Sequence, residues 1–285
     1  MAELISVIVA TYNREDALDA VLRSLAHQTD HEFEVVVADD GSGTETARVI
    51  KAWTTELPVP LKHAWHQDRG FRLAEIRNRA IRVSAGQYCV FLDGDCIAPS
   101  GFVAAHRRLA ERGWFVTGNR ALLSSAFTDE ILRRRLDLSR WTASAWIGSR
   151  MLGRVNRLAP LLTLPLGPLR KLEAQGWRGA RGSNMAFWRE DLDRVDGFDA
   201  TFNGWGREDS DIFVRMIRSG TRRKDGRFAT GVLHLWHREA DRSLLRQNER
   251  KLDDVIGGER VRALRGLSAL IEETQPAPQG QQEWA

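Results

Sequence analysis

The chain has 285 residues, of which 42% are hydrophobic and 28% charged, so it is long enough for one large α/β domain of ordinary globular composition. Its formal net charge of +4 is too small to argue for nucleic acid as a partner. The two cysteines, Cys89 and Cys96, form neither a zinc pattern nor a disulfide framework, which indicates reduced thiols. We therefore predict a cytoplasmic protein, with neither a secretory leader nor an apolar run long enough to cross a bilayer.

The first half of the chain alternates strand patterns with helical patterns. The predicted strands are Leu4–Ala10, Phe33–Ala38, Leu61–Trp65 and Tyr88–Leu92, and the predicted helices between them are Glu15–His27, Thr44–Trp53 and Leu73–Ser84. Repeated βαβ units build parallel sheets through right-handed crossovers. We therefore predict an α/β fold with a mostly parallel central sheet flanked by helices, and ligands at the carboxyl ends of its strands.

The first strand runs into Thr11, Tyr12, Asn13 and Arg14. A nucleobase could stack on Tyr12 while the guanidinium of Arg14 approaches a phosphate. The same residues also suit a helix entry, with Thr11 or Asn13 as the N-cap. The two interpretations do not exclude each other.

The second strand ends at Asp39-Asp40-Gly41-Ser42, where a carboxylate could accept hydrogen bonds from a uracil N–H or a ribose hydroxyl. A turn followed by a helix cap is the alternative, and it is the better one for this segment alone. Arg77 belongs to the helix before the fourth strand. It could reach a diphosphate, hold carboxylates near that strand, or be a solvated arginine.

The fourth strand stops at Asp93-Gly94-Asp95. Two carboxylates one residue apart, at the carboxyl end of a parallel strand, can hold a hard divalent cation through oxygen. The alternative is a surface turn, because Asp-Gly is also common turn chemistry.

The segment 127–171, here called the basic insert, mixes helical apolar residues with Trp141, Trp146 and many basic residues. The basic residues are Arg133, Arg134, Arg135, Arg140, Arg150, Arg154, Arg157, Arg170 and Lys171, opposed only by Asp129, Glu130 and Asp137. Three interpretations stay open: a lid over an acceptor, a surface that binds anionic membrane, or a packed helical subdomain with a solvated arginine face.

The second half contains two further predicted strands, Ser183–Trp188 and Thr230–Trp236, and a helix, Asp209–Ser219. Arg238–Glu273 reads as charged and helical with a break at Gly257-Gly258, and 274–285 as a disordered tail. We expect a single domain over 1–273. Its parts would be a nucleotide-binding half (about 1–120), the basic insert, an acceptor and catalytic half (175–240) and C-terminal helices (241–273).

The block Gly204-Trp205-Gly206-Arg207-Glu208-Asp209 places a tryptophan between two glycines, where its flat face could stack on a sugar ring. Glu208 and Asp209 then open a helix whose dipole favours their ionised state, as a general base requires. Acidic helix capping is the alternative, but it does not explain the glycines around Trp205.

His234 and His237 end the last predicted strand, and either imidazole could join a cation held by Asp93 and Asp95. Packed or solvated histidines are more common than ligands. No cysteine or third histidine lies nearby to support a zinc site.

In chain order, these segments resemble the family 2 glycosyltransferases with the nucleotide-sugar-binding GT-A fold. The segments are Ser6–Arg14, Asp39–Ser42, Arg77–Ala80, Phe91–Asp95, Gly182–Ala186 and Gly197–Asp199. The Gly204–Asp211 block further resembles chondroitin-type polymerases and β-1,4-galactosyltransferases. The basic insert matches no motif of that family.

The resemblance implies a site for a nucleotide-sugar donor and a glycan or glycolipid acceptor. The implied donor residues are Thr11, Tyr12, Arg14, Asp40, Arg77, Asp93 and Asp95. Mn²⁺ or Mg²⁺ would be bound by Asp95, with Asp93 on ribose or metal, His237 as a further ligand and His234 in reserve. Asp209 would be the base, Glu208 would hold the acceptor, and Trp205 and Asn184 would contact sugar.

The implied reaction is one in-line displacement that inverts the anomeric carbon, with Asp209 taking the proton of the acceptor hydroxyl. Two other functions stay open: a polyprenyl-phosphate sugar synthase and a nucleotide-sugar-binding module without turnover. The first would not need the Gly204–Asp211 block. The expected location is the cytoplasm, with peripheral association at the inner face of the membrane as an option.

Overall fold

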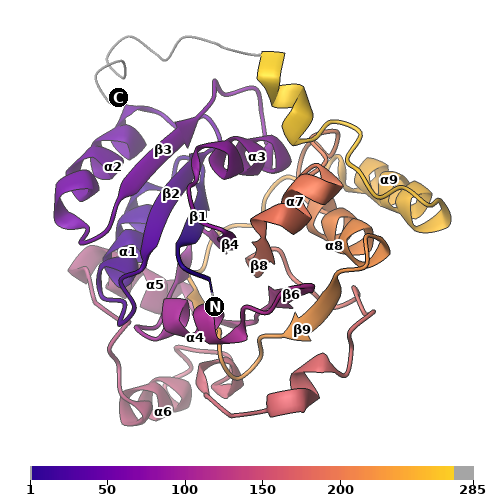
Figure 1. The fold of residues 1–285 in the computed structure, drawn as a ribbon. Helices are drawn as coiled ribbons and strands as arrows, with labels where there is room; N and C mark the ends of the chain where they lie inside the picture. Colours follow the sequence, from indigo (N-terminus) through magenta and orange to yellow (C-terminus); the bar gives the residue numbers. More distant parts are fainter. Residues whose placement is uncertain (1, 273–285) are drawn as a thin grey trace.

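The computed structural model of the chain describes residues 2–272 and is built around a seven-stranded sheet (Figure 1). The strand order is β3-β2-β1-β4-β8-β6-β9. These strands are β1 (Ile5–Thr11), β2 (Phe33–Asp39), β3 (Leu61–Trp65), β4 (Tyr88–Asp93), β6 (Trp114–Thr117), β8 (Asn184–Trp188) and β9 (Arg222–Asp225). β8 runs antiparallel to β4 and β6, and the other neighbours are parallel. The prediction of a mostly parallel central sheet is confirmed.

Helices cover both faces of this sheet (Figure 1). One face packs against α1 (Glu15–Ala26), α2 (Thr44–Glu56) and α4 (Phe102–Leu109). The other packs against α3 (Leu73–Val83), α7 (Arg189–Val195) and α8 (Glu208–Arg218). Alternate residues of one strand enter different cores, so Val7 and Val9 join the first and Ile8 joins the second. This double burial explains why β1, β2 and β4 read as nearly continuous apolar runs.

A second, three-stranded sheet contains β5 (Cys96–Ile97), β10 (Val232–His234) and β7 (Arg120–Leu122), in the order β5-β10-β7. The predicted strand Thr230–Trp236 is therefore shorter than expected. Its register sets His234 opposite Cys96, because β10 runs antiparallel to β5. This pairing holds β10, from the second half of the chain, beside Asp95.

The basic insert begins with α5 (Ser125–Arg134) and α6 (Ala143–Met151), and continues through the short 3₁₀ helices η1 (Ala159–Leu161) and η2 (Gly167–Lys171). The prediction of a helical insert holds for its first half only. Pro160, Pro165 and Pro168 follow, and proline excludes continuous α-helix because it lacks an N–H and clashes with the preceding turn.

The C-terminal segment differs from its prediction. It contains α9 (Leu245–Gly257) and a 3₁₀ helix, η3 (Leu267–Glu272), but 238–244 and 258–266 are not helical. In the stretch 258–266, the guanidinium of Arg260 pairs with the buried carboxylate of Asp199. The backbone N–H of Leu264 donates to the same carboxylate at 3.0 Å. This tertiary contact overrides helix propensity. The tail predicted at 274–285 lies outside the described residues. Among the helices within 2–272, none is both long and apolar enough to cross a bilayer.

Candidate active site

The predicted metal ligands come together where the two sheets meet. Asp95 follows β4, and its carboxylate lies 3.5 Å from His234 Nε2 and 3.3 Å from His237 Nε2. The N–H of Leu235 donates to the Asp95 carbonyl at 2.9 Å, which holds the two segments together. Asp93 and Cys96 belong to a second group around Asp95, with ligand atoms within 4.8 Å of one another.

The chemistry of this group suits a divalent cation. Burial lowers the pKa of His234 to about 4, so its imidazole is neutral and keeps a lone pair. His237 Nδ1 lies 2.6 Å from the carbonyl oxygen of Arg238. An Nδ1–H that donates there leaves Nε2 free as a ligand, the usual second contact of a metal-binding histidine. Carboxylate oxygen with neutral imidazole is a donor set that Mn²⁺ accepts.

Arg77 connects this group to the predicted catalytic acids. Its guanidinium is fully buried and lies 3.1 Å from Asp93 Oδ1 and 3.3 Å from Glu208 Oε1. It also donates to the carbonyl oxygen of Gly182 at 3.3 Å and faces the ring of Phe198. Of the roles considered for Arg77, holding the carboxylates agrees with this position, whereas a solvated arginine does not.

Glu208 and Asp209 begin α8, directly after Arg207, whose φ of 79° lies in the left-handed region. Glu208 is buried, and burial together with the charge of Asp209 raises its pKa to about 7. Asp209 is more exposed. Its Oδ2 accepts a hydrogen bond of 2.9 Å from the N–H of Gly182.

Gly182 therefore binds Asp209 through its N–H and Arg77 through its carbonyl oxygen. A Cβ at this position would lie 2.9 Å from the Cβ of Asp209, closer than side chains tolerate. The sequence did not single out Gly182 as a positioning residue. The available signal was its position two residues before β8, the strand that pairs with β4.

Trp205 projects from a turn whose glycines, Gly204 and Gly206, have φ of 73° and 101°. Its ring is 38% exposed, and the guanidinium of Arg242 lies 4.7 Å from the ring centroid. The N–H of Gly204 donates to the carbonyl oxygen of Phe71 at 2.9 Å. Beside this contact is a hollow of about 310 Å³, lined by residues 69–72, 203–204, 240–241 and 243–244. The two halves of the chain thus meet next to the exposed indole.

The residues after β1 remain accessible in part. Tyr12 is exposed, and its hydroxyl donates to Asp68 at 2.9 Å. Arg14 pairs with Asp16 at 3.0 Å. The hydroxyl of Thr11 is buried and has no hydrogen-bond partner within the described part of the chain. A buried hydroxyl without a partner is rare in folded proteins and is open to a ligand.

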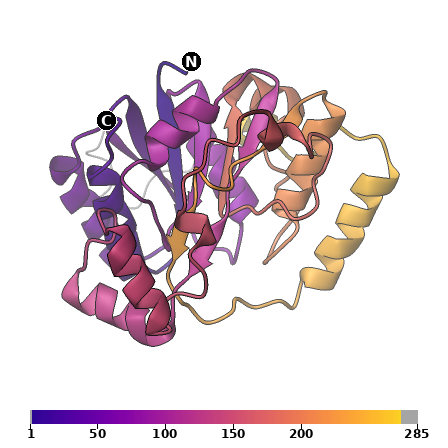
Figure 2. The same cartoon turned by 90° about the horizontal axis from the view of Figure 1, so that it is seen from below.

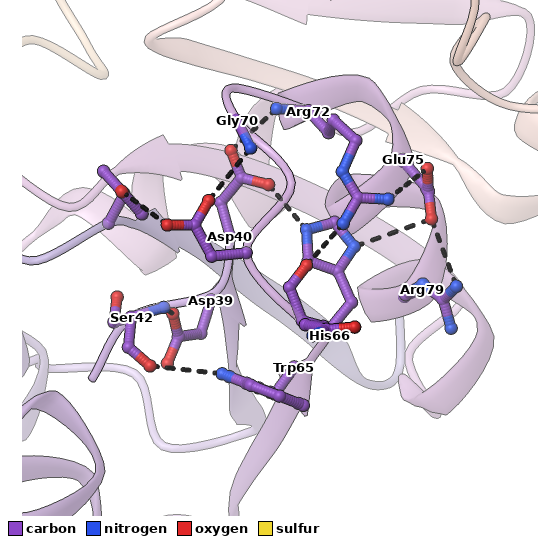
Figure 3. A network of polar contacts seen from close by, with 12 residues as sticks. Asp39, Asp40, Ser42, Trp65, His66, Gly70, Arg72, Glu75 and Arg79 are labelled. Atoms are coloured by element: carbon purple, nitrogen blue, oxygen red, sulfur yellow. Dashed lines mark hydrogen bonds and ion pairs between the residues drawn. The ribbon is translucent and has the colours of Figure 1, made fainter. Parts of the chain in front are cut away.

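Asp40 lies in a buried polar network with His66, Arg72 and Glu75 (Figure 3). Asp40 Oδ1 is 2.6 Å from His66 Nε2, and Oδ2 accepts from the N–H of Arg72 at 2.8 Å. The other ring nitrogen of His66 is 3.6 Å from Glu75, which also pairs with Arg72 and Arg79 at 3.1 Å each. Burial opposes charge on Glu75, but its partners outweigh it and lower the pKa to about 2.

His66 and Glu75 were missed by the sequence analysis. The available signal was position, because His66 directly follows β3, whose carboxyl end belongs to the same sheet edge as Asp40.

Asn184, the implied sugar contact, is completely buried at the start of β8. Its Oδ1 lies 3.2 Å from His106 Nε2, and its amide nitrogen donates to the carbonyl oxygen of Thr230. The structure thus places Asn184 in the framework beneath the site and not on an acceptor surface.

Residues 6–161 match the family model described as glycosyl transferase family 2, and residues 172–238 match the model described as the N-terminal domain of galactosyltransferase. The chain belongs to glycosyl transferase family 2. Its similarity to validoxylamine A glucosyltransferase of Streptomyces hygroscopicus subsp. limoneus is 30% identity over 234 residues, covering 76% of this chain and 48% of the relative. Chondroitin synthase of Escherichia coli is 26% identical over 237 residues, covering 76% and 32%. The family 2 chain thus spans half or less of the length of these two relatives.

Solved structures agree with the fold. TarS of Staphylococcus aureus in complex with UDP aligns with a TM-score of 0.57 at 16% identity, covering 93% of the family 2 chain and 68% of the other. Mannosyltransferase PcManGT of Pyrobaculum calidifontis, in complex with GDP-Man and Mn²⁺, aligns with a TM-score of 0.54 at 20% identity, covering 84% and 58%. These matches confirm the GT-A fold, and the chondroitin synthase relative confirms the resemblance to chondroitin-type polymerases.

Proposed function

We propose that this chain is a metal-dependent inverting glycosyltransferase, which moves a sugar from a uridine diphosphate sugar to a hydroxyl of a glycan or glycolipid. The observation that carries the proposal is the series of contacts from the metal group to the predicted base. Arg77 binds Asp93, Glu208 and Gly182, and Gly182 binds Asp209. A donor diphosphate near Asp95 and an acceptor near Asp209 would therefore share one rigid frame.

Asp95 and His237 would hold the cation, with Asp93 and His234 as further ligands. When bound, Mn²⁺ or Mg²⁺ supplies positive charge against the diphosphate leaving group. Tyr12, Asp40 and the unpartnered hydroxyl of Thr11 would bind the nucleoside.

Asp209 is a better base than its neighbour on structural grounds. Glu208 has a pKa raised to about 7, but it is buried and bonded to Arg77, whereas Asp209 is more exposed. Its hydrogen bond from Gly182 orients the carboxylate, and orientation is a large part of what a catalytic group contributes. Asp209 then takes the proton of the acceptor hydroxyl, whose oxygen forms the new bond as the diphosphate oxygen departs.

This function is tested with a panel of nucleotide sugars. Each nucleotide sugar is incubated with the chain, a series of acceptors and Mn²⁺. We expect release of the nucleoside diphosphate from one uridine donor, arrested by a chelator and restored by added metal. NMR of the product should show the anomeric configuration opposite to that of the donor. Turnover that a chelator leaves intact, or retained configuration, would contradict the proposal.

A polyprenyl-phosphate sugar synthase is the second candidate, and the acceptor chemistry separates the two. A phosphate oxygen is already ionised at neutral pH and needs no general base, whereas a sugar hydroxyl does. Activity on a polyprenyl phosphate that survives Asp209→Asn would favour the synthase. Tight binding of a donor without turnover of any donor in the panel would favour a nucleotide-sugar-binding module without catalytic activity.

A further inference from the structure

The later part of the basic insert exposes an unusual amount of apolar surface. Met151 is 83% exposed and Leu152 71%, and Leu172, directly after the insert, is 78% exposed. Further large apolar side chains of the same segment are exposed: Ile147, Leu162, Leu164 and Leu169. Soluble monomers rarely gather so many exposed apolar side chains in one segment unless the segment binds something.

The same segment is strongly and uniformly positive. Between Leu138 and Leu172 there is no Asp or Glu, and there are six basic residues: Arg140, Arg150, Arg154, Arg157, Arg170 and Lys171. Its formal charge of +6 exceeds the +4 of the whole chain, so the remainder is net acidic. The partner of this surface must therefore accept positive charge and apolar side chains together.

Two of these arginines are available to such a partner. Arg140 and Arg150 are exposed, and no carboxylate among the described residues lies within ion-pair distance of either. Arg134 and Arg135, earlier in the insert, are already paired with Glu130 at 2.9 Å and Asp19 at 2.8 Å. Among the described residues, unpaired positive charge therefore lies on Arg133 of α5 as well as around α6.

The structure also explains how α6 presents its apolar side chains. Trp146 and Ser149 are buried, and the ring of Trp146 packs 5.0 Å from that of Trp141. This anchored side leaves Ile147 and Met151, which are four residues apart and so lie on one face, directed away from the protein. α6 and the η1–η2 segment lie along the lower side of the molecule in Figure 1, and Figure 2 shows them on the side facing the viewer.

We propose that residues 138–172 dock on an anionic lipid bilayer, with Ile147, Met151 and Leu152 entering the headgroup region and Arg140 and Arg150 binding lipid phosphates. Basic residues next to exposed apolar side chains are the combination that binds such interfaces. A second copy of this chain fits less well, because the same surface would bring positive charge against positive charge. The inference goes beyond the proposed transfer reaction and does not depend on it.

Co-sedimentation of the full chain with vesicles tests the proposal. Vesicles of phosphatidylcholine alone are compared with vesicles in which a third of the lipid is phosphatidylglycerol. We expect the chain to sediment only with the anionic vesicles, and to be released by high salt because the interaction is partly electrostatic. Absence of sedimentation with anionic vesicles at low salt overturns the proposal.

The apolar contribution is tested by the triple substitution Ile147→Gln, Met151→Gln and Leu152→Gln, which keeps good helix formers on an exposed face. Vesicle affinity should fall at least about tenfold, whereas the matched control Leu264→Gln, at an exposed leucine outside the segment, should retain it. Equal binding by the triple variant and the wild type overturns the assignment of this surface.

The charge contribution is tested by Arg140→Gln with Arg150→Gln, against Arg48→Gln on α2 as the control. Arg48 is exposed and paired with Glu45. Only the double variant should lose affinity, by about tenfold or more, and its salt dependence should weaken. The wild type could instead fail to bind vesicles but self-associate in gel filtration, with the triple variant remaining monomeric. That outcome would identify a second copy of the chain as the occupant and overturn the lipid proposal.

Discussion

His66 lies between two buried carboxylates, with Nε2 2.6 Å from Asp40 and Nδ1 3.6 Å from Glu75. Burial disfavours an imidazolium, but these carboxylates outweigh it and raise the pKa of His66. His66 therefore links Asp40, directly after β2, to Glu75 of α3, as Figure 3 shows. Asp40, the residue implied in base recognition, is held by this contact.

His66→Gln should destabilise the fold in a pH-dependent way. A pKa raised on folding contributes stability that is fully present below the unfolded pKa of about 6.5 and disappears as pH rises through the folded pKa. We expect the variant to lose about 1.5 to 3 kcal/mol near pH 6, the scale of hydrogen bonds to charged groups, and less near pH 9. Urea unfolding at both pH values measures this. A loss that does not shrink towards pH 9 would contradict a charged His66.

Asp95→Asn should remove metal-dependent binding of the donor nucleotide, because an amide oxygen is a poorer ligand than a carboxylate. Calorimetry of UDP binding with and without Mn²⁺ measures the effect, with Asp253→Asn, at an exposed position of α9, as the control. His237→Ala should weaken Mn²⁺ affinity more than His234→Ala, since Nδ1 of His237 is oriented by the carbonyl oxygen of Arg238. The opposite order would make His234 the ligand.

Asp209→Asn should slow transfer by about a hundredfold or more, the scale of general-base catalysis, and leave donor affinity nearly unchanged. Titration of UDP and measurement of kcat on the same preparation separate the two quantities. An equal loss of donor binding would assign Asp209 a structural role.

Gly182→Ala should lower kcat by about tenfold or more, because the new methyl group would displace the carboxylate of Asp209, and small misplacements of catalytic groups are costly. Gly101→Ala is the matched control, since its Cβ would meet nothing within 4 Å. We expect near-normal kcat for the control and a normal UDP affinity for both. A Gly182→Ala enzyme with full kcat would show that the contact does not position the base.

Glu208→Gln should stabilise the protein at alkaline pH. The pKa of Glu208 is raised to about 7 by burial, so its favourable contribution is present below the unfolded pKa and is lost as pH rises through 7. The amide carries no buried charge, so the Tm of the variant should exceed that of the wild type at pH 8 and not at pH 4. A Tm at pH 8 no higher than the wild type would indicate that Arg77 fully compensates the carboxylate.

Local sequence was sufficient for much of the architecture. The strands that become β1, β2 and β4 are largely apolar, with Ser6 and Glu34 as exceptions, because both faces of a central parallel strand are buried. The positions of Asp40, Asp93 and Asp95 at the ends of such strands then followed from chain order. The Gly204–Asp211 block was recognisable because glycines on either side of a tryptophan have no simple packing explanation.

Only the tertiary structure decided what each polar residue contacts. The pairing of His234 with Asp95 depends on β10 meeting β5, two short strands far apart in the chain, and no local pattern encodes that register. The role of Gly182 depends on Arg77 of α3, which donates to its carbonyl oxygen, and on Asp209 of α8, which accepts from its N–H. The end of α9 at Gly257 agrees with the break predicted at Gly257-Gly258, but the non-helical path of 258–266 involves the contacts of Asp199 with Arg260 and Leu264. Periodicity reports which face of an element is buried, whereas the partner of a buried charge is selected by the whole fold.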